Sequence, residues 1–174
     1  LRAAAIYLLL MTTDHLVPDV MVPNMRVVFC GTALGARSAA DRAYYAHPGN
    51  RFWKALHAHG FTPHRVAPKD YPCVTQWGIG LTDVCKTHSG NDDEIPRETY
   101  DAQRLHKEIE RLQPAIVAFT GKEAARQFLQ LKSTGKIPYG FLPQRIGKTR
   151  LFVLPSPSGH AAKYWTEEPW KELA

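Results

Sequence analysis

Residues 26–35 read Arg-Val-Val-Phe-Cys-Gly-Thr-Ala-Leu-Gly, and this stretch decides the fold class. Its first half, 26–30, is a short run of apolar and β-branched residues, which predicts a buried strand. The run ends at a turn flanked by Gly31 and Gly35. A strand followed by such a turn is how an α/β domain exposes a site at the carboxyl end of a strand. We therefore expect functional residues in this turn.

Three further apolar runs predict strands at residues 77–84, 115–119 and 150–154. Helices are expected at residues 50–59, 96–112 and 123–131 and, in short form, after Pro169. Strands that alternate with helices favour a parallel sheet covered on both faces. The sequence thus predicts an α/β fold: a three-layer α/β/α sandwich with a central four-stranded, mostly parallel sheet.

The chain has 174 residues, of which 44% are hydrophobic and 22% charged. This is the composition of an ordinary globular domain, and it excludes a disordered chain and a collagen-like fibre. We expect one domain over residues 16–174 and a leader outside the core over residues 1–15. The first ten residues are apolar but too short for a complete signal peptide.

Cysteine and histidine spacing argues against a bound metal. The three cysteines, Cys30, Cys73 and Cys85, form no CxxC pair, so neither a four-cysteine metal site nor a disulfide framework fits. The eight histidines show no HxH or HExxH spacing. No apolar run reaches the roughly 18 residues that span a bilayer. We expect a cytoplasmic protein with no metal, no organic cofactor and no membrane partner.

Positive charge is concentrated in the last third of the chain. The net charge is +6, and residues 121–163 hold eight basic side chains against one acidic side chain, Glu123. A phosphate-bearing partner would account for this run, and a solvated basic face is the alternative. The basic residues are Lys122, Arg126, Lys132, Lys136, Arg145, Lys148, Arg150 and Lys163.

Each predicted strand is followed by a loop with polar residues or glycines. The four loops cover residues 31–35, 83–91, 120–122 and 156–163. In a parallel sheet, all four would meet at the carboxyl edge, where such folds bind ligands. The spacing therefore predicts one composite site without naming its reaction.

A resemblance names the reaction. Residues 44–53, Tyr-Tyr-Ala-His-Pro-Gly-Asn-Arg-Phe-Trp, resemble the signature of mismatch-specific uracil/thymine DNA glycosylases in the uracil-DNA glycosylase superfamily. Residues 31–35, 78–83 and 155–159 resemble, in order, the family's G-[IV]-N-P-G, G-[IV]-G-x-T-[ND] and P-[NS]-x-S-[GA] motifs. The resemblance covers residues 16–173. The hypoxanthine-DNA glycosylase branch shares the tyrosine–His-Pro-x-Asn pattern.

The resemblance implies a monofunctional enzyme that flips uracil out of DNA and hydrolyses its N-glycosidic bond, leaving an abasic site. Its partners would be uracil-containing double-stranded DNA and the abasic product. A monomer is expected because a flipped nucleotide needs one pocket, and a bacterial protein would be associated with the nucleoid. A hydrolase that uses Ser156 or Ser158 with His160 is a weaker reading, since no G-x-S-x-G nucleophile elbow is present.

The first half of the chain would supply the base pocket. By resemblance, Tyr45 stacks on the flipped base, worth about 1–3 kcal/mol, and a core tyrosine is the alternative. Asp83 occupies the position that reads the pyrimidine edge, with a loop-orienting aspartate as the alternative. His47, beside Pro48, is expected to shape the pocket loop. The turn at Gly31, Thr32 and Ala33 would form the pocket floor.

The last loop would contact the DNA. By resemblance, Gly159, His160 and Ala161 form the tip that enters the duplex, and Lys163 binds phosphate. Ser156 would bind a phosphate or deoxyribose oxygen, while His160 is also a candidate to assist the departing base. Two further residues, Lys122 and Ser158, are expected to contact DNA.

One position departs from the family pattern. Ala33 stands where relatives carry asparagine, aspartate or glutamate, and alanine can neither position water nor stabilise charge on the sugar. Asn50 and Asp83 are the candidates to replace that function, and a helix N-cap is the alternative role for Asn50. If neither acts, the chain would bind lesions or abasic DNA with little or no catalysis. A hypoxanthine or xanthine substrate is the other alternative.

Overall fold

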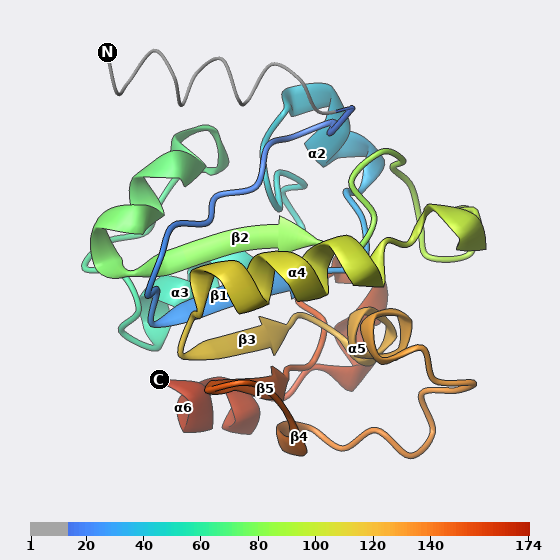
Figure 1. Ribbon diagram of the computed structural model, residues 1–174. Helices are drawn as coiled ribbons and strands as arrows, with labels where there is room; N and C mark the ends of the chain where they lie inside the picture. Colours follow the sequence, from blue (N-terminus) through green and yellow to red (C-terminus); the bar gives the residue numbers. More distant parts are fainter. Residues whose placement is uncertain (1–13) are drawn as a thin grey trace, which may run out of the picture.

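The computed structural model describes residues 14–174. Its strands are Val27–Gly31 (β1), Ile79–Asp83 (β2), Ile116–Phe119 (β3), Gly140–Ile146 (β4) and Thr149–Val153 (β5). They form one five-stranded sheet in the order β2-β1-β3-β5-β4 (Figure 1). Four strands run parallel, and β4 pairs antiparallel with β5. The predicted α/β fold with a mostly parallel sheet is confirmed, but the sheet has five strands, one more than expected.

The additional strand, β4, lies at the edge of the sheet and carries no apolar pattern. Its sequence is Gly-Phe-Leu-Pro-Gln-Arg-Ile, and Pro143, Gln144 and Arg145 are exposed. Proline has no backbone N–H, so it is tolerated in a sheet at an edge or a bulge. The pairing with β5 shifts register between Phe141 and Arg145. Because half of this strand faces solvent, its hydrophobicity could not predict it.

Helices cover both faces of the sheet (Figure 1). Alternate side chains of β1 pack against the helices on opposite faces of the sheet. The Phe29 ring contacts Phe52 and Trp170, with centroids 5.3 and 5.9 Å apart, whereas Cys30 packs in the cluster that contains Leu105. The α-helices are Ala36–Asp41 (α2), Phe52–Ala58 (α3), Ala102–Leu112 (α4), Lys122–Leu129 (α5) and Glu168–Leu173 (α6). Thus α3 and α6 line one face, and α4 and α5 line the other.

Some boundaries differ from the expected ones. The helix expected from Pro96 begins at Ala102, because the Asp101 side chain caps it by accepting a hydrogen bond from Arg104 N at 2.9 Å. Trp77 ends a 3-10 helix instead of opening a strand. The 3-10 helices are Pro68–Trp77 (η1), Arg97–Thr99 (η2) and Gly159–Tyr164 (η3).

The segment before β1 wraps the outer side of β2. Leu16 N donates to Lys86 O, and Val20 and Leu81 exchange both backbone hydrogen bonds, all at 2.9 Å. Val17 is fully buried in the core. Most of the expected leader, residues 1–13, lies outside the described residues. Across residues 14–174, each helix is too short or too polar to cross a bilayer.

Candidate functional site

The carboxyl edge of the sheet brings the predicted loops together. Gly31 and Asp83 are register partners at the ends of β1 and β2. The loop after β2 then follows the turn after β1, since Val84 N donates to Gly31 O at 3.0 Å and Cys85 N to Thr32 O at 2.9 Å. The two turns are therefore fixed to each other by their backbones.

The last loop joins the same edge from the other side. A Cβ on Gly121 would lie 3.5 Å from Ser156 Cβ. Arg51 N donates to Pro157 O at 2.8 Å, and a Cβ on Gly159 would lie 3.4 Å from Gly49 O. Thus the segment 44–53 and all four predicted loops converge on one region.

Tyr45 stands at the centre of this region in a fixed orientation. Its ring is stacked on Phe52, with centroids 3.8 Å apart and an interplanar angle of 19°. Its hydroxyl lies 3.0 Å from Thr120 Oγ1, and its backbone has a left-handed φ of 52°. Burial raises the pKa of Tyr45 well above its ordinary value, so the side chain remains a neutral phenol. Because one face is held by Phe52, the ring is rigid before any ligand arrives.

Asp83 is a buried carboxyl group without a full set of partners. Only 2% of the residue is exposed, and Oδ2 has no hydrogen-bond partner within the described part of the chain. Burial raises the pKa of Asp83 to about 6, against the opposing effect of nearby Lys86. An ionised carboxylate only accepts hydrogen bonds, while the protonated form also donates one. Near pH 6 this group can therefore present either form to a ligand.

A buried charge network supports the end of β2. Lys86 Nζ lies 3.0 Å from Asp19 Oδ1 and donates to Tyr44 Oη at 2.6 Å. Arg104 donates from one nitrogen to Asp19 Oδ2 at 2.7 Å and from another to the backbone oxygen of Asp83 at 2.8 Å. Two cations thus stand near two carboxylates, Asp19 and Asp83. The network anchors the strand end that carries Asp83.

The segment 47–52 forms a tight turn held by its own side chains. His47 Nδ1 accepts a hydrogen bond from Gly49 N at 3.0 Å, consistent with the expected loop-shaping role. Asn50 Oδ1 accepts from Phe52 N at 2.9 Å, at the first residue of α3. This contact satisfies the first N–H of α3, but the N-cap is Arg51, so Asn50 stands one residue before the N-cap and holds the turn instead of capping the helix as the alternative predicted. It uses only the amide oxygen and leaves the NH₂ group for another partner.

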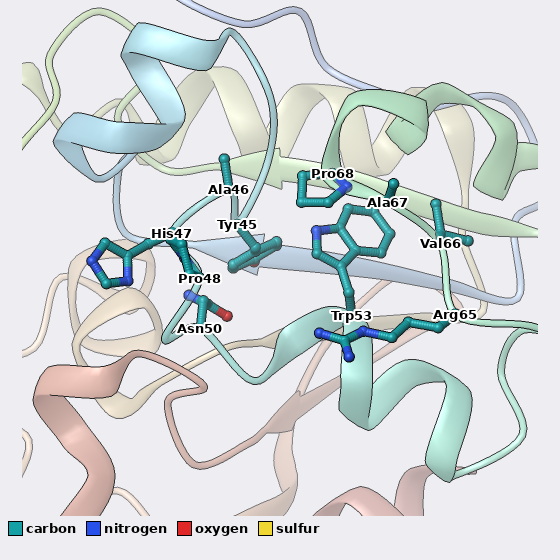
Figure 2. Close-up of a pocket in the computed structure, with 10 residues that line it drawn as sticks. All are labelled: Tyr45, Ala46, His47, Pro48, Asn50, Trp53, Arg65, Val66, Ala67 and Pro68. Atoms are coloured by element: carbon teal, nitrogen blue, oxygen red, sulfur yellow. The ribbon is translucent and has the colours of Figure 1, made fainter.

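A pocket of about 380 Å³ opens beside Tyr45 (Figure 2). Figure 2 shows one wall built from the turn at His47, Pro48 and Asn50, and another from residues 66–68, with the Trp53 indole between them. Gly31, Asp83 and Ser156 are absent from its lining. The predicted residues therefore form two neighbouring groups, one in the pocket and one at the sheet edge, and Tyr45 belongs to both.

The expected insertion tip forms a short helix. Gly159, His160 and Ala161 make the first turn of η3, where the Ser158 hydroxyl accepts from His160 N at 3.3 Å. Ser156 Oγ accepts from Ser158 N at 3.3 Å. His160 is exposed, as is Lys163 at the other end of the turn. These side chains are free to reach a partner outside the pocket.

An additional carboxyl group, Asp92, lies near Thr32, the neighbour of the unusual position 33. The loop after β2 pairs with the first turn, since Gly90 N donates to Leu34 O at 2.9 Å. This brings Asp92 close to the Thr32 side chain, and partial loss of solvent raises the pKa of Asp92, although the residue as a whole stays exposed. The acidic run 92–94 was a visible signal, but nothing local to it indicates proximity to Ala33. Within residues 14–174, no group of three or more His, Cys, Asp or Glu side chains could hold a metal ion.

Comparison with known proteins places this arrangement in a family context. The family model described as the Uracil DNA glycosylase superfamily matches residues 18–174. A similar fold occurs in the solution NMR structure of a "putative Uracil DNA glycosylase" from Methanosarcina acetivorans, with a TM-score of 0.61 and 20% sequence identity. The match covers 90% of this chain and 96% of that one. At this identity the structural match supports the fold, and the family model carries the assignment.

Proposed function

The chain belongs to the uracil DNA glycosylase superfamily, and from this we propose that it excises uracil from double-stranded DNA as a monofunctional, monomeric enzyme. Hydrolysis would break the bond between C1′ and N1 of the nucleotide. The bonding electrons leave with the base, which takes up a proton, and the hydroxyl of water joins C1′. The product is an abasic site in an uncut strand. The motifs at residues 44–53 and 78–83 support the mismatch-specific type within the superfamily.

The observation that carries this proposal is the grouping of Gly31, Tyr45 and Asp83. A Cβ on Gly31 would lie 3.5 Å from the Tyr45 hydroxyl and would collide with Asp83 Oδ1. A planar base that enters the pocket beside Tyr45 would meet a rigid aromatic ring, with the buried Asp83 carboxyl group at the neighbouring sheet edge. Ionised Asp83 would accept the uracil N3–H, and the protonated form would also donate to O4. This arrangement suits the edge of a pyrimidine.

Charge development at the sugar requires electrostatic support, because the transition state resembles an oxocarbenium ion. We assign the positioning of the sugar or water to the free NH₂ group of Asn50. Support of the sugar charge by Asp83 is the alternative to its role at the base edge, because one carboxyl group cannot reach both ends of the base. His47 would hold the turn that presents Asn50. Ser156 would contact a phosphate or sugar oxygen, while Lys122 and Lys163 neutralise the DNA backbone.

Single-turnover excision tests the proposal. A labelled duplex with one uracil is incubated with excess enzyme, and abasic sites are cleaved with alkali. Wild type should release uracil, and Asn50→Ala or Asp83→Ala should slow release by about 10²-fold or more. Asn91→Ala and Asp93→Ala are matched controls on the exposed part of the loop after β2. If both controls lose as much activity as the site variants, the residue assignment is wrong.

A lesion-binding protein with little catalysis is the second candidate. It is favoured by the alanine at position 33 together with the use of Asn50 Oδ1 in the turn before α3. In that case wild type releases no uracil but shifts uracil-containing or abasic duplexes far more tightly than undamaged DNA. Duplexes with hypoxanthine, xanthine or thymine, run in the same assay, define the substrate range.

A further inference from the structure

Two tyrosines and two lysines form a surface patch outside the pocket described above, in which Lys163 and Tyr164 are exposed and Lys122 and Tyr139 are half-buried. We call it the Tyr–Lys patch. Its members come from three separate segments: Lys122 from the first turn of α5, Tyr139 from the residues before β4, and Lys163 and Tyr164 from η3. None of the pocket-lining residues belongs to it. The motifs that identified the family do not include either tyrosine.

In both halves of the patch, an ammonium group lies over an aromatic ring. Lys122 Nζ is 4.6 Å from the Tyr139 ring centroid, and Lys163 Nζ is 4.8 Å from the Tyr164 ring centroid. Such cation–π contacts keep a long side chain close to the ring. Tyr139 also packs against the buried cluster that contains Phe119 and Phe128, whereas the Tyr164 ring keeps most of its surface in solvent and can accept another partner. Tyr164 is 61% exposed, the highest value among the large apolar side chains of residues 14–174.

The two halves lie near each other and next to the candidate site. Gly121, which precedes Lys122, contacts Ser156, the residue from which the chain runs on into η3. Burial raises the pKa of Tyr139, and an ionised Tyr164 would add to this rise. A strand of DNA that leaves the site along η3 would pass over Tyr164, the last residue of that helix.

The positive charge of the patch is uncompensated by neighbours. Neither Lys122 nor Lys163 takes part in an ion pair within the described range. Glu123, the adjacent acid, is held by Arg126 through two hydrogen bonds of 2.9 and 2.5 Å. The lysines therefore remain available for phosphate groups.

We propose that the Tyr–Lys patch binds single-stranded DNA, with an unpaired base stacked on Tyr164, phosphates on Lys163 and Lys122, and half-buried Tyr139 holding Lys122 in place. An exposed ring with cations beside it matches the bases and phosphates that a single strand presents together. Only an unpaired base can offer its face to this ring, because both faces of a duplex base are covered by its neighbours. This inference deepens the proposed function: DNA is the partner, and unpaired DNA beside the lesion is the form that this surface prefers.

Fluorescence anisotropy with a labelled, undamaged single strand tests the patch. Tyr164→Ala should weaken binding by about 5- to 100-fold, the usual effect of removing a stacked ring. Tyr164→Phe should bind like wild type, since it keeps the ring and loses only the hydroxyl. Lys163→Ala and Lys122→Ala should each reduce the dependence of log affinity on log salt by about 0.7. The same sequence as a blunt duplex should lose much less affinity in Tyr164→Ala.

Two matched control variants test whether the loss of any exposed apolar side chain, or of any cation, would weaken binding in the same way. Leu131→Ala removes an exposed apolar side chain, 41% exposed, from the end of α5. Lys148→Ala removes a cation at the amino end of β5, the opposite edge of the sheet. Both should bind the single strand like wild type. Thermal unfolding of each variant verifies that it is folded.

The inference is overturned if Tyr164→Ala binds the single strand like wild type, or if Tyr164→Phe loses as much affinity as Tyr164→Ala. It is also overturned if single strand and duplex lose affinity equally. Because the probe contains no uracil, the result does not depend on excision. Failure of uracil release with intact Tyr164-dependent binding would contradict the proposed function alone.

Discussion

Gly31 and Asp83 are register partners, and Asp83 Oδ1 occupies the space that any side chain at Gly31 would need. Gly31→Ala should therefore displace the carboxyl group. We expect a loss of about 1–3 kcal/mol in stability from overpacking and of about 10²-fold in excision, since misplacement near 1 Å has that effect. Single-turnover excision and thermal unfolding measure the two losses. Gly35→Ala is the control, because a Cβ there meets nothing within 4 Å. Equal excision by both variants would contradict the prediction.

Asp83→Asn should stabilise the protein at neutral pH. The folded-state pKa of about 6 lies above the ordinary 3.8, so the folded state binds protons more tightly than the unfolded state. Wild type therefore loses stability as pH rises from about 4 to 6, by about 3 kcal/mol at most. The neutral amide avoids this loss, so the difference in unfolding free energy between variant and wild type should grow across that window and then level off. Denaturant unfolding at pH 4 to 8 measures it, with exposed Asp93→Asn as control. A difference independent of pH would show that Asp83 does not titrate there.

The two ends of the Asn50 side-chain amide have different roles. The oxygen holds the turn by accepting from Phe52 N, and the NH₂ group is free for another partner. Asn50→Ala should lower stability by about 0.5–1.5 kcal/mol, the net contribution of one hydrogen bond, and should also abolish most excision. Asn50→Asp keeps an acceptor for Phe52 N, so its stability should stay near that of wild type while excision falls by about 10²-fold. Unfolding and single-turnover rates of the two variants measure this split. Full activity in Asn50→Asp would reduce Asn50 to a structural role.

Replacing Asp19 should lower the free energy of unfolding far more than replacing an exposed aspartate. Burial alone would raise the pKa of Asp19, but Lys86 and Arg104 outweigh burial and hold the pKa below its ordinary value. The stabilisation is thus present above about pH 4 and is lost as pH falls through the folded pKa. Asp19→Ala leaves buried Lys86 unpaired and should cost about 3–5 kcal/mol at pH 7.

Two comparisons test this prediction for Asp19. Asp41→Ala, which breaks the exposed pair with Arg37, should cost at most about 1 kcal/mol. Adding Lys86→Met to Asp19→Ala should restore part of the lost stability, because the unpaired charge is gone. Urea unfolding of the three variants gives the values. If Asp19→Ala and Asp41→Ala lose the same unfolding free energy, the buried network adds no more stability than an exposed ion pair.

The sequence predicted those parts of the fold that bury continuous apolar runs. Val27 to Cys30 and Leu151 to Val153 are all nearly inaccessible to solvent, so their hydrophobicity marked the strands. Hydrophobicity could not predict β4, because Pro143, Gln144 and Arg145 face water. This strand forms through its backbone hydrogen bonds with β5. Strand identity at such an edge depends on a partner far along the chain.

The same distinction applies to the site. Convergence of the loops after β1, β2, β3 and β5 followed from the parallel sheet alone. The approach of Asp92 to Thr32 did not, because it depends on backbone pairing between two loops, with Ser89 and Leu34 as bridge partners. Nor could the sequence tell that the Asn50 oxygen turns toward Phe52. Side-chain direction within a loop is decided by contacts that no local pattern encodes.

Both outer strands of the sheet are poor templates for adding a strand from another molecule. Along β2, backbone groups of Leu81 are already paired with Val20. On β4, Pro143 offers no N–H and the register shift distorts the strand. Regular, unprotected edges are where sheet proteins join into aggregates. The chain thus carries a safeguard against fibre formation at the high concentrations reached during overexpression.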